Sequence, residues 1–198
     1  DDIIAYLSKS VITHPKDKSF IISSDKDFLQ LVSENVVVYR PMEKEYYTPQ
    51  TVVDKYKMSP HNFILHKTLL GDNSDKIKGV KGLGEKGLLK KFPELVEKDM
   101  NWDDILNICE NKISDHVVYA RIIHGQDDLE KNYKIMDLSN PMLSKKDKEY
   151  LDKIVEANDL SYYPDQFVAM YNEDQIGGLI RNVEFWVKDC FQNLVIKK

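Results

Sequence analysis

Residues 71–87 read GDNSDKIKGVKGLGEKG, and this stretch is the most informative part of the chain. Two aspartates, Asp72 and Asp75, are followed at once by a glycine-rich hairpin in which every charged residue except Glu85 is a lysine. Carboxylates bind divalent metal ions, whereas lysines and exposed backbone amides bind phosphate. Because both kinds of group occur within one short segment, we predict a phosphodiester held beside metal ions.

The charge of the chain is segregated around this stretch. Over all 198 residues the net charge is −5, and the 42% hydrophobic and 31% charged content is typical of a soluble globular protein. Residues 67–91 hold seven lysines against three acidic residues, so this window carries a net charge of +4. A basic surface of this kind suits nucleic acid even in an acidic chain.

The remaining composition argues against other classes of protein. No apolar run approaches the roughly 20 residues that a membrane span needs. Cys109 and Cys190 lie far apart and fit no metal spacing, which indicates reduced thiols and a cytoplasmic location, in a bacterial cell or a phage-infected host. The five histidines form no H-E-x-x-H motif, so a zinc hydrolase is not expected.

The apolar pattern predicts an α/β fold that is followed by helices. Strands are expected at residues 20–23 (a buried parallel strand), 36–40 and 45–48, and helices at 51–58 and 61–71. Further helices are expected at about 88–98, 102–110, 114–124, 145–157 and 174–193. We expect residues 160–198 to pack around the apolar side chains Phe167, Leu179, Phe185 and Trp186.

Two domains follow from this pattern. Residues 1–66 are predicted to form an α/β core with a partial parallel sheet and flanking helices. Residues 67–198 are predicted to form a helical region with a helix–hairpin–helix motif at about 71–92.

Carboxylates stand at the ends of several predicted elements. Asp25 and Asp27 follow the strand at residues 20–23, where ligands bind in open α/β sheets. Asp1 and Asp2 begin the first helix, and Asp72 and Asp75 follow a later one. Taken singly, each pair has a simpler explanation, because Asp25 suits a helix cap and the later pair suits a turn. Taken together, the six predict a site for Mg²⁺ or Mn²⁺.

The hairpin is open to more than one interpretation. GLGEKG at residues 82–87 satisfies the dinucleotide-binding pattern, but no apolar strand precedes it, and it also lacks the lysine of a P-loop. A helix–hairpin–helix that contacts the phosphates of a duplex fits better and predicts little sequence specificity. An ordinary solvated lysine face is the alternative. The candidate nucleic-acid-binding residues are Lys76, Lys78, Gly79, Lys81, Gly82, Gly84, Lys86, Lys90 and Lys91.

These segments resemble the 5′-nuclease superfamily of flap endonucleases and 5′–3′ exonucleases, in particular its bacteriophage ribonuclease H branch. The similarity covers residues 1 to about 92 and rests on DDIIA at 1–5, SSDKDF at 23–28, GDNSDKI at 71–77 and the hairpin. It implies two catalytic metal ions, a K⁺ ion at the hairpin, and Asp2 as a lesser candidate ligand. The implied metal ligands are Asp1, Asp25, Asp27, Asp72 and Asp75, of which the last four are the candidate catalytic residues.

The chain also departs from the pattern of this superfamily. Relatives carry a glutamate two residues before the position of Asp1, earlier aspartates on a first strand and a cationic helical arch. The sequence opens directly in an amphipathic helix, DDIIAYLSKSV, so we expect that an N-terminal portion of a longer protein is missing. A fragment without those ligands is expected to have an incomplete metal site and to be inactive on its own.

The resemblance implies hydrolysis of 5′ flaps, nicks or RNA–DNA hybrids by two metal ions, in the removal of RNA primers during DNA replication. The implied partners are a DNA or RNA–DNA duplex with a 5′ end and a replication protein, with the chain as a monomer and no membrane involved. The main alternative is a duplex-binding module without catalytic activity, and a PIN-like ribonuclease toxin is a more distant one.

Overall fold

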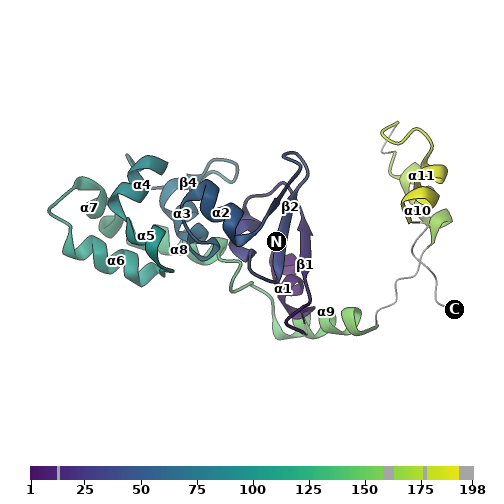
Figure 1. Cartoon of the computed structure of the whole chain (residues 1–198), viewed down its shortest axis with the longest axis horizontal. Helices are drawn as coiled ribbons and strands as arrows, with labels where there is room; N and C mark the ends of the chain where they lie inside the picture. Colours follow the sequence, from purple (N-terminus) through teal and green to yellow (C-terminus); the bar gives the residue numbers. More distant parts are fainter. Residues whose placement is uncertain (13, 158–162, 176–177, 192–198) are drawn as a thin grey trace. The chain divides into compact units, whose positions relative to one another are not determined.

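A computed structural model describes residues 1–12, 14–157, 163–175 and 178–191 of the chain (Figure 1). The chain forms two compact units, Asp1–Glu149 and Tyr150–Lys198. Among the described residues, none of the helices combines the length and the apolar character needed to cross a membrane.

A small mixed sheet forms the first half of unit 1. Strand β1 (Ser19–Ile22) pairs in parallel with β2 (Val36–Arg40), and β2 pairs antiparallel with β3 (Glu45–Tyr47). Val36, Val38 and Tyr47 face the same buried core as Ile21. Helix α1 (Asp2–Ser10) contributes Ala5 to this core, and the 3₁₀ helix η1 (Asp27–Leu31) contributes Phe28 and Leu29. The predicted α/β class and the three predicted strands are therefore confirmed.

The prediction of a buried first strand is wrong in one respect. Among the described residues β1 is an edge strand of the sheet. Its side chains alternate between the two faces, so Ile21 is buried while Phe20 is 57% and Ile22 is 72% exposed. A short apolar run predicts the strand but does not show whether both of its faces are covered.

Helix α3 (Phe63–Leu70) joins the sheet to the helical part of unit 1. Its Phe63 packs in the core of the sheet, whereas Leu65 and Leu69 belong to the core of the helical part. Helix α2 (Pro49–Tyr56) and the 3₁₀ helix η2 (Pro60–Asn62) precede α3. The short strands β4 (Gly71–Asp72) and β5 (Ile77–Lys78) follow it and form an antiparallel ladder.

The helical part continues as a group of helices that lie together (Figure 1). They are α4 (Glu85–Lys91), α5 (Glu94–Glu97), α6 (Trp102–Asn111), α7 (Val117–His124) and α8 (Gln126–Met136). The helix predicted at 88–98 is two helices, because the residue before a proline avoids the helical conformation and Phe92 precedes Pro93. Helix α8 is not predicted from the sequence. Its residues are mostly polar, and among them only Leu129 and Met136 are buried.

Asn62 anchors the start of α3 to the helical part. It is fully buried, and its side-chain amide donates to the carbonyls of Leu95 (2.9 Å) and Lys98 (2.7 Å). Its side-chain oxygen accepts the backbone N–H of Met100 at 2.8 Å. These three bonds satisfy the amide inside the core and thereby fix the position of α3.

Helix α9 (Lys145–Ala157) crosses from unit 1 into unit 2, where α10 (Pro164–Glu173) and α11 (Val183–Phe191) follow. Phe167 stacks on Tyr171 and Trp186, with ring centroids 6.4 and 6.0 Å apart. Leu179 and Phe185 are 82% and 67% exposed, so the prediction that they pack in this unit is wrong. The predicted helix at 174–193 is replaced by α11, and its residues 176–177 and 192–193 lie outside the described part.

Candidate functional site

Two glycines fix the position at which the acidic segment, residues 71–75, follows α3. Gly71 ends α3 with φ of 80°, a left-handed conformation that favours glycine. A Cβ on Gly79 would lie 2.1 Å from the carbonyl carbon of Leu70, so the residue that follows β5 packs directly against the C-terminal end of α3. Asp72 therefore starts its ladder at a fixed place directly beyond α3.

Three aspartates from two distant segments meet at this point. Asp27, at the start of η1, lies beside Asp72 and Asp75, and each offers a carboxylate oxygen within 4.8 Å of the others. Asp72 is also held by its own turn, because one of its oxygens accepts the backbone N–H of Ser74 at 2.8 Å. The turn-forming role weighed from the sequence is thus present together with the convergence of the carboxylates.

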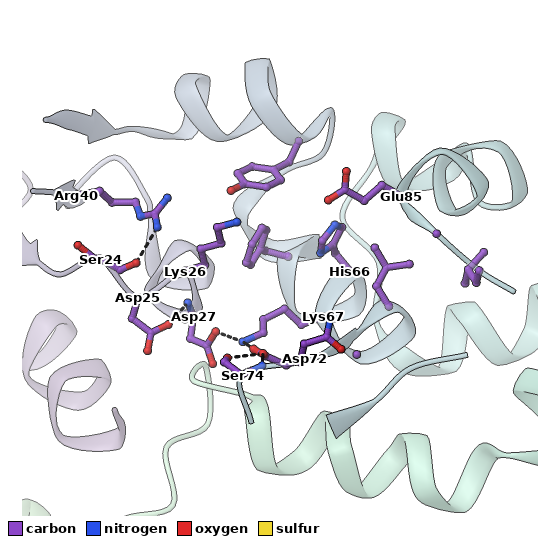
Figure 2. Close-up of a pocket in the computed structure, with 17 residues that line it drawn as sticks. Ser24, Asp25, Lys26, Asp27, Arg40, His66, Lys67, Asp72, Ser74 and Glu85 are labelled. Atoms are coloured by element: carbon purple, nitrogen blue, oxygen red, sulfur yellow. Dashed lines mark hydrogen bonds and ion pairs between the residues drawn. The ribbon is translucent and has the colours of Figure 1, made fainter. Parts of the chain in front are cut away.

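A buried lysine lies inside this acidic cluster. The ammonium group of Lys67, on α3, donates to Asp27 and lies 2.7 Å from Oδ2 of Asp72 (Figure 2). Hydrogen bonds from Lys67 and then Ser74 hold the pKa of the Asp72 carboxyl well below its usual range. By charge alone Lys67 falls in the basic window of residues 67–91, and its place inside the acidic cluster is not predicted from the sequence. A signal was available, because a lysine within the apolar helix FILHKTLL must be paired if it is buried.

Asp25 borders the same site from the end of β1. Its carboxylate oxygen accepts the backbone N–H of Asp27 at 2.9 Å in an Asx turn just before η1. The N-cap of η1 is Lys26, so the capping role weighed for Asp25 from the sequence is wrong. It is exposed and also lines the adjoining cavity. Arg40 stands next to it and donates to the carbonyl of Ser24 at 2.7 Å (Figure 2).

The cluster opens into a cavity of about 750 Å³. One wall carries Asp25, Lys26 and Arg40, and the opposite wall carries His66 and Glu85 (Figure 2). Burial lowers the pKa of the His66 imidazole, which therefore favours the uncharged ring at neutral pH. His66 stacks on Phe63 with ring centroids 5.3 Å apart. The cavity thus has an anionic end, a cationic side and an aromatic wall.

Asp1 and Asp2 lie elsewhere. Asp1 precedes α1 and is exposed, and Asp2 accepts the backbone N–H of Met142 at 3.0 Å. Neither residue lines the cavity that the described residues form. Of the six aspartates predicted as metal ligands, the structure brings Asp27, Asp72 and Asp75 together with Asp25 at the border, and the role of Asp1 and Asp2 stays a prediction.

The hairpin places most of its lysines in solvent. Lys76, Lys78, Lys81, Lys86 and Lys90 are exposed, whereas Lys91 is half-buried, with its ammonium 5.7 Å from the centroid of the Tyr119 ring. Gly82 has φ of 82°, which suits glycine at this turn, and a Cβ on Gly84 would meet open space.

Arg121 on α7 supports the hairpin and was not found from the sequence. Its guanidinium donates to the carbonyl of Lys81 at 2.8 Å. Asn132 on α8 donates to the carbonyl of Lys78 at 3.5 Å. Both contacts join the hairpin to helices that come much later in the chain, so no local sequence pattern predicts them.

Comparison with known proteins shows which proteins this chain resembles in sequence and in fold. Residues 1–57 match the family described as the 5′-3′ exonuclease N-terminal resolvase-like domain. The fold is similar to that of the bacteriophage T5 flap endonuclease in a complex with DNA and metal ions, with a TM-score of 0.64 and 19% identity over 79% of this chain and 58% of that chain. These findings, with the sequence relatives below, confirm the resemblance to the 5′-nuclease superfamily.

Two relatives found by sequence similarity support the same resemblance. The 5′-3′ exonuclease of Aquifex aeolicus is 35% identical over 141 residues, which is 70% of this chain and 44% of that protein. DNA polymerase I of Bacillus subtilis is 42% identical over 107 residues, which is 50% of this chain and 12% of that protein. The chain therefore spans less than half of the length of these two relatives. The predicted likeness to the bacteriophage ribonuclease H branch stays a prediction.

Proposed function

We propose that this chain forms the metal-binding and duplex-gripping part of a structure-specific 5′ nuclease. The proposed reaction is hydrolysis of phosphodiester bonds in 5′ flaps, nicks or RNA–DNA hybrids, with removal of RNA primers during replication as its cellular role. The observation that carries the proposal is the convergence of Asp27, Asp72 and Asp75 to within 4.8 Å, next to a lysine-rich hairpin.

The residues present fit a pair of hard divalent cations. Every candidate ligand in the cluster is a carboxylate, which favours Mg²⁺ or Mn²⁺ over softer metals. When bound, such ions activate water and offset the charge that develops on the phosphate. In this proposal Asp27, Asp72 and Asp75 hold the ions, and Asp25 orders η1 and completes the site from its border.

The hairpin supplies the grip on the duplex in this proposal. Its exposed lysines are free to reach phosphates, and phosphate contacts position a duplex without reading its sequence. Arg121 keeps the hairpin in place through the carbonyl of Lys81. In this proposal residues 1–66 contribute Asp25 and Asp27 to the metal site. Residues 67–198 contribute Asp72, Asp75 and the lysines that contact the duplex. A K⁺ ion at the hairpin, a monomeric state and a replication-protein partner remain part of the proposal.

A duplex-binding module without catalytic activity is the second candidate. The observation that favours it is the ammonium of Lys67, which already neutralises part of the acidic cluster. One assay separates the two functions. A 5′-labelled flap substrate is incubated in Mg²⁺ and in EDTA with this chain and with a version extended upstream of Asp1, and both cleavage and binding are measured. Cleavage that requires Mg²⁺ by either version supports the nuclease, whereas binding without cleavage by both supports the module.

The proposed contacts between the hairpin lysines and the phosphates of the duplex lead to a quantitative prediction. Changing Lys81→Ala together with Lys86→Ala is expected to weaken duplex affinity by roughly tenfold or more, because each lysine that contacts a phosphate releases counterions. The slope of log K against log salt should fall by about 2 in magnitude. Fluorescence anisotropy at several salt concentrations, with duplexes of unrelated sequence, measures both quantities.

A matched control keeps the change in net charge the same. Lys16→Ala with Lys18→Ala removes two exposed lysines from the loop before β1, and is expected to change affinity little. If the hairpin variant loses affinity for one sequence alone, or if both double variants behave alike, the role of the hairpin in gripping phosphates is contradicted.

A further inference from the structure

Lys67 is a cation buried within a helix that is otherwise largely apolar. Its residue is 6% exposed, and its neighbours Leu65, Thr68 and Leu69 on α3 are also buried. A buried ammonium group is destabilising unless charged partners surround it. Its position therefore depends on the carboxylates at the end of its side chain.

Those carboxylates are also the candidate metal ligands. Lys67 forms ion pairs with Asp27 and Asp72, which are two of the three aspartates in the acidic cluster. The side chains of Lys67, Asp27 and Asp72 are 7%, 13% and 17% exposed, so the three charges are poorly screened by water. The carboxylates that pair with Lys67 are therefore two of those that a divalent ion would need.

We propose that Lys67 is a built-in counter-ion that a divalent metal ion must displace. This inference rests on the proposed metal centre and concerns how that centre is loaded. In the metal-free chain the ammonium offsets the mutual repulsion of Asp27 and Asp72 and so stabilises the folded site. A doubly charged ion between the same oxygens repels the ammonium and replaces it.

The surroundings allow this exchange. Lysine carries its charge on a flexible four-carbon stem, and Lys67 lines the cavity of about 750 Å³ that adjoins the cluster. Its head group can therefore leave the two carboxylates by rotation of its side chain, without movement of α3. The consequence is competition, in which Lys67 lowers the apparent metal affinity while it protects the metal-free fold.

Titration calorimetry with Mn²⁺ and thermal unfolding test this inference. Lys67→Met removes the charge and keeps most of the stem, so we expect roughly tenfold tighter Mn²⁺ binding, as for loss of a competing cation. In EDTA the melting temperature of this variant should fall below that of the parent, and excess Mn²⁺ should restore most of the loss. Lys67→Arg keeps the charge and should stay close to the parent in both measurements.

Lys26→Met is the matched control. Lys26 lines the same cavity but is exposed and has no ion pair among the described residues. Its removal takes the same charge from the same cavity, so we expect a much smaller change in Mn²⁺ affinity and no loss of stability in EDTA. Equal effects of the two substitutions would show general electrostatics rather than displacement and would overturn the inference.

A measurement on the parent chain avoids any folding defect of the variants. An amine-reactive reagent followed by peptide mass spectrometry should label Lys67 faster in Mn²⁺ than in EDTA, because the displaced ammonium reaches the open cavity. Unchanged or slower labelling overturns the inference, as does Mn²⁺ binding by Lys67→Met that is no tighter than in the parent. If neither chain binds Mn²⁺ at all, the metal centre fails together with the inference.

Discussion

Replacing Asp72 by asparagine in the proposed intact enzyme, which is extended upstream of Asp1, is expected to slow Mg²⁺-dependent cleavage of a flap substrate by roughly a thousandfold or more, while duplex affinity is retained. Asparagine has nearly the same shape but lacks the charge that binds a divalent ion, and metal-assisted stabilisation of the transition state is worth several kcal/mol. The hairpin lysines are unchanged by this substitution, so the grip should persist. Cleavage is measured under single-turnover conditions and duplex affinity by anisotropy.

Calorimetry supplies an independent reading of the same variant. Asp72→Asn should lose most of its heat of Mn²⁺ binding, since Asp72 is a member of the three-carboxylate cluster. Asp54→Asn on α2 is the control, because Asp54 is exposed and accepts a hydrogen bond from Gln50 away from the cavity. Normal turnover by the Asp72 variant would contradict the assignment of the metal centre.

Gly79→Ala is expected to destabilise unit 1 by about 3 kcal/mol or more, because the added methyl group has no space. Its Cβ would lie 2.1 Å from the carbonyl carbon and 2.3 Å from the carbonyl oxygen of Leu70, and 2.4 Å from the nitrogen of Gly71. These are backbone atoms, which cannot turn aside as a side chain can. Denaturant unfolding followed by circular dichroism measures the loss.

The same hairpin offers a control for Gly79→Ala. At Gly84 an added Cβ meets no atom within 4 Å, so Gly84→Ala is expected to change stability by less than about 1 kcal/mol. The prediction fails if both alanine variants unfold at the same denaturant concentration. If Gly79→Ala folds in a shifted form, it should also bind Mn²⁺ more weakly, because Asp72 and Asp75 lie on the segment that Gly79 holds against α3.

Much of the candidate site could be predicted from the sequence because its candidate ligands lie at the ends of regular elements. Asp27 follows β1, and Asp72 follows α3, so the periodicity of those elements places the carboxylates at the edge of a cavity. Local turn chemistry then accounts for the hydrogen bonds of Asp25 and Asp72.

Other features depend on packing between segments that are distant in the sequence, which no sequence pattern predicts. Lys67 lies on α3, which packs against α8, and α8 is too polar to be predicted by its pattern. Asp2 binds the backbone of Met142, a contact between distant segments that no spacing rule predicts. Arg121 reaches the hairpin from α7 in the same way. A count of charges along the sequence groups Lys67 with the hairpin lysines that are proposed to bind the duplex, although its side chain points into the acidic cluster.

The short β4–β5 ladder has a consequence for where the proposed enzyme would cut. Asp72 lies on β4, Lys78 on β5, and both strands are held against the last turn of α3 by Gly71 and Gly79. A duplex held by the lysines would therefore meet the carboxylates at a constant offset along its backbone. In the proposed enzyme the ladder would thus set the distance between the lysines that bind the duplex and the carboxylates that hold the metal ions.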